Sequence, residues 1–279
     1  MLSISAIKDL DYSPKPLDSR DPERELDIYS PSTNNESLPV ILFVHGGAWR
    51  TGDKSEHMQL AERLSQQGFV VVVNNYRLRK EKNESWNNCL YFTDTENINR
   101  LSHKSENNGP PIIQHPSHIK DTMDAVRYIQ SRYEGRKLFL VGHSAGAHII
   151  LSIALKPEFQ LPGIDGYIGV EGIYDIPLLL KTFPDYLDFI QQAFTDNQAE
   201  YSKASLIGFT PAPIHSPIAL LYSPEDELID PGQHESIYSW LKFHDIVATV
   251  KANLHGKHDE CLTTSEMTDA IGDFVRNQL

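Results

Sequence analysis

The chain has 279 residues, enough to bury a sizeable core in one domain, and its 40% hydrophobic and 23% charged residues are typical of a globular protein. Its 25 Lys and Arg against 38 Asp and Glu leave a formal charge of −13, which argues against a nucleic-acid surface and against adsorption to anionic lipid. The longest apolar runs, of about five residues, are far too short to span a membrane, and charged residues at positions 8, 9 and 11 interrupt any signal-peptide pattern. With only Cys89 and Cys261, a disulfide scaffold or a cysteine-rich zinc site is not expected. These features predict a soluble, cytoplasmic protein with neither nucleic-acid nor membrane partners.

The N-terminal residues 1–37 are polar and rich in proline, which limits regular structure there, although Glu25–Tyr29 has the composition of a short strand. From Val40 onward, apolar strands alternate with helical patterns. The expected strands are Val40–His45, Phe69–Asn74, Lys137–Val141, Gly166–Glu171, Pro217–Ser223 and Ile246–Lys251. The expected helices are Lys54–Gln67 (with Met58, Ala61 and Leu64 on one face), Ser117–Arg132, Ala145–Leu155, part of Leu178–Phe194, Pro231–Phe243 and Thr264–Gln278. This alternation predicts one open α/β domain over residues 1–279, with a mostly parallel sheet covered on both faces.

The stretch 80–115 interrupts this alternation. It is rich in asparagine, ends in Gly109-Pro110-Pro111 and shows no sustained period. A loop of this length within a compact domain is usually functional or disordered. We interpret it as an insertion. A solvated or disordered loop is favoured over an ordered lid. The large apolar residues around Trp86 and Tyr91 leave an ordered lid as the alternative interpretation.

The segment Gly142-His143-Ser144-Ala145-Gly146 has the G-x-S-x-G pattern of a nucleophile elbow. It follows an expected strand and opens an expected helix, which is the setting that the motif requires. Small residues let the backbone turn sharply and present the Ser144 hydroxyl above the sheet. We therefore predict Ser144 as a nucleophile, against the alternative of a glycine-lined turn in which the serine only caps a helix.

A second glycine-rich segment, His45-Gly46-Gly47-Ala48-Trp49, follows the first buried strand. Glycines suit a loop whose main chain must approach a reacting carbonyl group closely. We predict that the amides of Gly47 and Ala48, together with that of Ala145, form an oxyanion hole. The alternative is an ordinary turn at a strand end.

A serine hydroxyl needs an adjacent base, and in this kind of fold the acid and then the histidine follow the serine along the chain. Asp226, just after the strand Pro217–Ser223, is the chosen acid, although position alone does not exclude its neighbours Glu225, Glu227 and Asp230. For the base, position alone leaves His255 and His258 nearly even.

The other histidines show no metal-ligand spacing, and neither a Walker A nor a G-x-G-x-x-G loop is present, so no metal or cofactor is expected. We expect His143 to pack beside the elbow. Most of the remaining histidines are expected at the surface, including His57, His103, His115, His118 and His234.

Taken together, the elbow, the His-Gly-Gly segment and the ordered acid and histidine resemble those of the α/β-hydrolases. The string from His45 to Trp49 resembles the HGGxW motif of the kynurenine formamidases, of the fungal type, and Asn75–Leu78, Glu171–Tyr174 and Ser223–Leu228 add to the likeness. The resemblance runs from about Val40 to the C-terminus. Glu171 departs from the aspartate expected before Gly-Ile-Tyr.

The resemblance implies a Ser144–His258–Asp226 triad, with His258 preferred over His255, and hydrolysis of N-formyl-L-kynurenine to L-kynurenine and formate. Trp49 is expected either to border an aromatic leaving-group pocket or to pack in the core. A short-chain carboxylesterase is the alternative function, and a non-catalytic interaction protein is a more remote one. The sequence contains no direct sign of oligomeric state, so a homodimer stays an open expectation.

Overall fold

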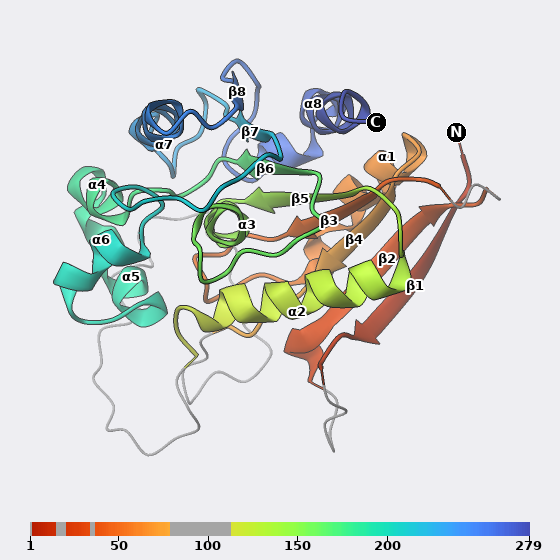
Figure 1. The fold of residues 1–279 in the computed structure, drawn as a ribbon, viewed down its shortest axis with the longest axis horizontal. Coiled ribbons are helices and arrows are strands. Elements are labelled where there is room, and N and C mark those ends of the chain that lie inside the picture. Colours follow the sequence, from red (N-terminus) through yellow and green to blue (C-terminus); the bar gives the residue numbers. More distant parts are fainter. Residues whose placement is uncertain (1, 15–20, 34–36, 79–112) are drawn as a thin grey trace.

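The computed structural model describes residues 2–14, 21–33, 37–78 and 113–279 (Figure 1). The insertion expected at 80–115 falls almost wholly outside these ranges. Eight strands of the described chain form one sheet in the order β1-β2-β4-β3-β5-β6-β7-β8. The strands are β1 Ile4–Asp11, β2 Glu25–Pro31, β3 Val40–Val44, β4 Val70–Asn74, β5 Leu138–His143, β6 Gly166–Val170, β7 Ile218–Leu221 and β8 Ala248–Lys251.

From β4 to β8 every neighbouring pair of strands is parallel, whereas β1 and β2 add to one edge in antiparallel fashion. The helices are α1 Met58–Gln66, α2 Ser117–Arg132, α3 Ala145–Leu155, α4 Ile176–Thr182, α5 Leu187–Ala193, α6 Tyr201–Ala204, α7 Gly232–Phe243 and α8 Ser265–Arg276. Short 3-10 turns occur at Pro22–Arg24, Lys54–His57, Pro184–Tyr186, Gln198–Glu200 and Glu260–Thr263. The prediction of a mostly parallel sheet surrounded by helices is confirmed.

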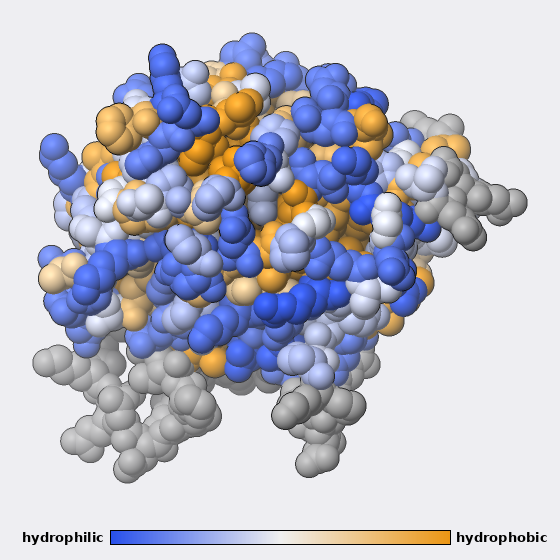
Figure 2. Space-filling model, in the orientation of Figure 1, coloured by the Kyte–Doolittle hydropathy of each residue, from blue (hydrophilic) through white to orange (hydrophobic). Residues whose placement is uncertain are grey.

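Alternate residues of the central strands point to opposite faces and so build two apolar layers. On β3, Ile41 and Phe43 pack with apolar residues of α1 and α8, whereas Leu42 and Val44 pack with those of α2, α3 and α7. Figure 1 shows α2 and α3 in front of the sheet, and the outward side of α2 is largely hydrophilic (Figure 2). This two-sided burial explains why the strands read as continuous apolar runs.

The N-terminal segment holds more regular structure than its composition predicts. The side chains of β1 are mostly exposed, so this edge strand carries no apolar pattern and forms through its pairing with β2. On β2, Leu26 and Ile28 are fully buried and join the core.

The expected apolar stripe of the first helix was partly wrong: Met58 is 47% exposed, and Leu60 takes its place beside Ala61 and Leu64. The segment begins as a 3-10 turn, which changes the phase of its side chains before α1 starts. None of the described helices combines the length and the apolarity needed to cross a bilayer.

Candidate active site

Ser144 lies in the sharp turn between β5 and α3. Its backbone, at φ 53° and ψ −117°, is in a conformation that non-glycine residues rarely adopt. The turn is tight: a Cβ on Gly142 would lie 2.3 Å from the Gly146 carbonyl oxygen, and one on Gly146 would lie 2.1 Å from the Val44 carbonyl oxygen. The flanking glycines are thus required for α3 to approach β3, and strain at the serine is typical of functional sites.

The predicted oxyanion loop follows β3 and faces the elbow. A Cβ on Gly46 would lie 3.0 Å from the Ser144 Cβ, so the two segments are in direct contact. Gly47, Ala48 and Trp49 all have positive φ, at 88°, 51° and 59°. Within the described ranges, no backbone or side-chain acceptor takes a hydrogen bond from the amides of Gly47, Ala48 or Ala145. These three N–H groups therefore stay candidate donors for the predicted oxyanion hole.

Tyr76, to which the sequence analysis gave no individual role, fixes the start of this loop. Its hydroxyl contacts the carbonyl oxygens of His45 at 3.1 Å and Gly46 at 2.8 Å. Its ring also stacks on the His45 imidazole, with the centroids 4.4 Å apart. Burial lowers the pKa of His45 to about 4, so this imidazole is neutral at pH 7. His45 is therefore a packing element of the loop.

The acid and base predicted from the chain order lie together. The Nδ1 atom of His258 is 2.8 Å from Oδ2 of Asp226, and their side chains are 6% and 0% exposed. The Oδ1 atom of Asp226 accepts hydrogen bonds from the amides of Leu228 and Ile229, at 2.8 and 2.9 Å. Burial alone would raise the pKa of Asp226, but the hydrogen bond and charge of His258 and the Ile229 amide hold it below its ordinary value. This pair can orient an imidazole and stabilise its protonated form.

His255 lies at the surface, apart from the His258–Asp226 pair. Its side chain is 69% exposed and binds Glu225 at the surface, with 3.0 Å between Nδ1 and Oε1. Glu225 raises the pKa of His255 through this hydrogen bond. The geometry thus favours His258, which sequence position alone could not separate from His255.

The acids that compete with Asp226 on sequence grounds support the same region in other ways. Glu225 accepts a hydrogen bond from the Gly256 amide and Glu227 accepts one from the His258 amide, each at 3.1 Å. Asp230 accepts from the Gly232 amide at the start of α7, at 2.9 Å. Of these four acids, Asp226 contacts the His258 imidazole.

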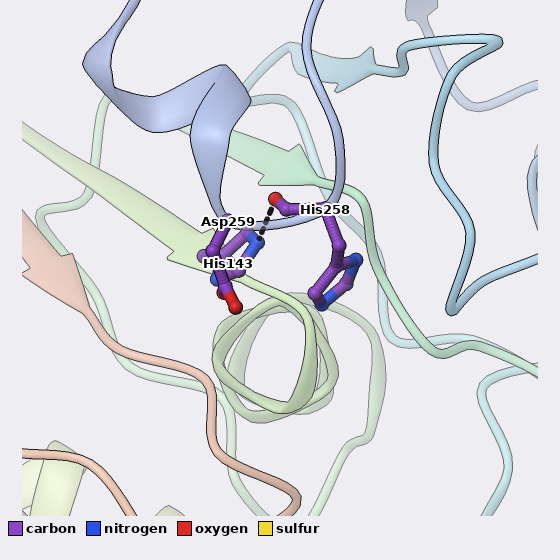
Figure 3. A group of neighbouring side chains, drawn as sticks. All are labelled: His143, His258 and Asp259. Carbon is purple, nitrogen blue, oxygen red and sulfur yellow. Dashed lines mark hydrogen bonds between the residues drawn. The ribbon is translucent and has the colours of Figure 1, made fainter. Parts of the chain in front are cut away.

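His143 packs beside the elbow, as expected, and its Nε2 lies 3.0 Å from the carbonyl oxygen of His258 (Figure 3). Together with Asp259, the two histidines place potential ligand atoms within 4.8 Å of one another. His143 Nε2 and His258 Nδ1 are already engaged in hydrogen bonds, however. We regard His143 as a support for the His258 backbone.

Trp49 belongs to the core. It is 1% exposed, and its ring packs edge-on against His148 and Phe194, with centroids 5.3 and 4.9 Å apart. Its position supports core packing, the second of its two expected roles.

The expectation of surface histidines was wrong for His118 and His234, which are 1% and 5% exposed, and His57 and His115 are half-buried. His103 lies outside the described residues. Neutral imidazoles pack among aromatic rings here, as where Tyr76 meets His118 edge-on, and helical periodicity contains no sign of such contacts.

Glu171, which the sequence analysis noted only as a departure from an expected aspartate, lies next to Asp226. Glu171, the first residue after β6, is 0% exposed, and its Oε1 accepts a hydrogen bond from the Ser223 amide at 2.7 Å. Burial, together with the hydrogen bond and negative charge of Asp226, raises the pKa of Glu171 to about 10. No local motif could have revealed this contact, because the two acids are joined only through the neighbouring strands β6 and β7.

Comparison with solved structures sets this site in context. Esterase B from Lactobacillus rhamnosus superposes with a TM-score of 0.70 at 17% identity, over 98% of this chain and 84% of its own. The chain has the α/β-hydrolase fold. The BD-FAE family model matches residues 26–89.

Curated relatives define the likeness further. A kynurenine formamidase of Meyerozyma guilliermondii is 29% identical over 251 residues, covering 83% of this chain and 84% of the relative. One of Scheffersomyces stipitis is 26% identical over 275 residues, covering 88% and 92%. The chain is a hydrolase of this fold that resembles the kynurenine formamidases over most of its length.

Proposed function

We propose that this protein is a kynurenine formamidase, which hydrolyses N-formyl-L-kynurenine to L-kynurenine and formate. The observation that carries the proposal is the likeness to kynurenine formamidases over more than four-fifths of the chain. The His258–Asp226 contact near the elbow supports it, since acyl transfer from an amide needs a nucleophile, a base and an acid that orients the base.

In the proposed first step, Ser144 Oγ attacks the formyl carbon while His258 Nε2 takes its proton. Asp226, bound to Nδ1, keeps the imidazole in the required tautomer and stabilises the imidazolium. Negative charge then develops on the formyl oxygen. The amides of Gly47, Ala48 and Ala145 are the donors that would hold it, and each preorganised donor of this kind contributes on the order of 10²–10³ in rate.

In the second step, His258 returns the proton to the departing arylamine, and L-kynurenine leaves a formyl group on Ser144. Water, activated by the same imidazole, attacks this formyl-enzyme and releases formate. The proposed steps use no cofactor or metal. Because the sequence has only two cysteines, we place the protein in a reducing compartment, the cytoplasm.

The same groups would also cleave a short-chain ester, whose alkoxide leaves more readily than an arylamine. The experiment that separates these functions compares kcat/KM for N-formyl-L-kynurenine with that for p-nitrophenyl acetate. We expect the formamide to be strongly preferred, because a pocket that fits a formyl group restricts longer acyl groups. A strong preference for the ester, with the formamide barely cleaved, would contradict the proposal.

A folded but non-catalytic interaction protein is tested separately. We expect Ser144 to be labelled by a fluorophosphonate probe, and we expect Ser144→Ala to abolish the labelling. Wild-type protein that stays unlabelled while folded would favour the non-catalytic reading.

A further inference from the structure

A second carboxyl group lies beside the acid of the proposed triad and has no part in the steps above. Glu171 is completely buried, with its Oε1 bound to the Ser223 amide. Its Oε2 atom is also buried and makes no hydrogen bond of ordinary geometry with the described residues. The two carboxyl groups of Glu171 and Asp226 lie within hydrogen-bond reach of each other. A buried acceptor without a donor is costly, so this arrangement requires an explanation.

Among the residues that the structure describes, no compensating cation faces Glu171. The titratable groups that face it are Asp226 from the loop after β7, Cys261 from the 3-10 turn at Glu260–Thr263, Tyr174 from the segment before α4, and Tyr222 just after β7. Each of these groups is either anionic or neutral. The Cys261 thiol also lies within reach of the Glu171 carboxyl group, but its single proton is directed to the His258 carbonyl oxygen, at 3.1 Å.

Two carboxylates in such a place do not both ionise, since like charges repel and burial penalises each of them. Asp226 is the better anion, because it accepts from the His258 imidazole and from two backbone amides. Glu171 accepts from the Ser223 amide and has an oxygen left without a donor. One proton on Oε2 of Glu171 removes both problems, as the orphaned acceptor becomes a donor and the repulsion disappears.

We propose that Glu171 is a protonated carboxylic acid in the active enzyme and that it donates a hydrogen bond from Oε2 to the Asp226 carboxylate, acting as a positioning residue. Only its relevance to catalysis rests on the proposed function. The neutral donor holds Asp226 in the orientation that meets His258 Nδ1, without adding a second negative charge to the site. The hydrogen bond from Glu171 would thus be a third contact to the Asp226 carboxylate, in addition to those from the amides of Leu228 and Ile229.

The protonation state is tested without any substrate. We expect the infrared spectrum of the wild-type protein at pH 8 to contain the carbonyl band of a protonated carboxyl group. The band should disappear as the pH is raised beyond about 10. It should also be absent from Glu171→Gln and remain in Glu225→Gln, since Glu225 is an exposed acid nearby. A wild-type spectrum with no such band at pH 8 would overturn the proposal, whatever the enzyme hydrolyses.

The effect on Asp226 is tested by kinetics with two substitutions of matched length. Glu171→Gln keeps an N–H donor for Asp226, so we expect kcat within about threefold of wild type and an unmoved acid limb of the kcat/KM profile. Glu171→Met removes the donor, and we expect kcat to fall by about tenfold or more with KM nearly unchanged. A shift of the acid limb toward lower pH in Glu171→Gln would mean that a negative charge had been removed, which contradicts a protonated Glu171. Equal kcat values for the two variants would contradict the positioning role.

Discussion

At the scale of single residues, the roles of the two candidate histidines depend on which acid each of them binds. Asp226 is buried against His258, while Glu225 binds His255 at the surface. A buried charged hydrogen bond is held in one geometry, whereas an exposed pair contributes little. The loop therefore contains a buried histidine and an exposed one only three positions apart.

This difference predicts the ranking of alanine variants. We expect Ser144→Ala and His258→Ala to lower kcat/KM for N-formyl-L-kynurenine by about 10⁴-fold or more, because each removes a group that moves a bond or a proton. His255→Ala should stay within about threefold of wild type, as expected for an exposed side chain. The values of kcat/KM are measured by steady-state kinetics on variants whose fold has been verified. If His255→Ala proves inactive and His258→Ala active, the base is His255.

At the scale of elements, the site depends on how closely α3 approaches β3. Gly146 lies in the first turn of α3, against the carbonyl oxygens of Val44 and His45, and a Cβ there would come within 2.1 and 2.6 Å of them. Both of those atoms belong to backbone, which cannot rotate away as a side chain would. The absence of one side chain thus lets Ser144 lie beside the segment His45–Trp49.

We therefore predict that Gly146→Ala destabilises the protein by about 1–3 kcal/mol through overpacking and also lowers kcat/KM at least tenfold, since the two loops must separate. Gly68→Ala is the matched control. Gly68 has φ +99° but open space around it, so alanine there should cost only about 1–2 kcal/mol of backbone strain and leave activity intact. Urea unfolding and kinetics measure both effects. Full activity of Gly146→Ala would show that the close approach is not needed.

At the scale of the whole molecule, several histidines of the described chain are buried or half-buried and neutral. Burial lowers the pKa of seven of them below the ordinary value of 6.5, namely His45, His57, His115, His118, His143, His148 and His234. Each takes up a proton on unfolding at mildly acidic pH. Their contribution to stability is complete above about pH 6.5 and is lost as the pH falls toward the folded values of about 3 to 4.

The protein should accordingly lose stability steeply below pH 6.5, by up to about 1.4 kcal/mol per pH unit for each such histidine. We expect His148→Gln to flatten this slope, because the amide can still reach the Ala204 carbonyl that His148 Nε2 contacts at 2.9 Å but does not titrate. His255→Gln should not flatten it, since Glu225 raises the pKa of His255 instead. Free energies of unfolding between pH 3.5 and 7 test this, and an unchanged slope in His148→Gln would count against it.

Glu171 acts in the opposite direction. Its pKa is raised from 4.5 to about 10, so the stability that its protonated form contributes declines as the pH rises through that range. Relative to wild type, Glu171→Gln should gain stability steadily from about pH 5 to 9. A constant difference across that range would indicate an ionised Glu171.

The sequence by itself determined the features that depend on a few adjacent residues. The bounds of α2 and α3 agree with their predicted ranges, and the elbow around Ser144 and the glycines of the Gly46-Gly47 loop could be read directly. A helical period, a glycine pattern or a turn is specified within about a dozen residues, which is why local reasoning suffices for them.

Only the tertiary structure decided the features that join distant segments. It placed Asp226 rather than its acidic neighbours on His258, brought Glu171 to Asp226 across adjacent strands, and paired the exposed strand β1 with β2. It also gave part of the −13 charge a structural role. In the acid-rich loop after β7, Glu225 and Glu227 accept hydrogen bonds from backbone amides of the loop that carries His258. Such contacts depend on how loops curve after neighbouring strands, and a chain carries no local signal of which side chains that curvature will bring together.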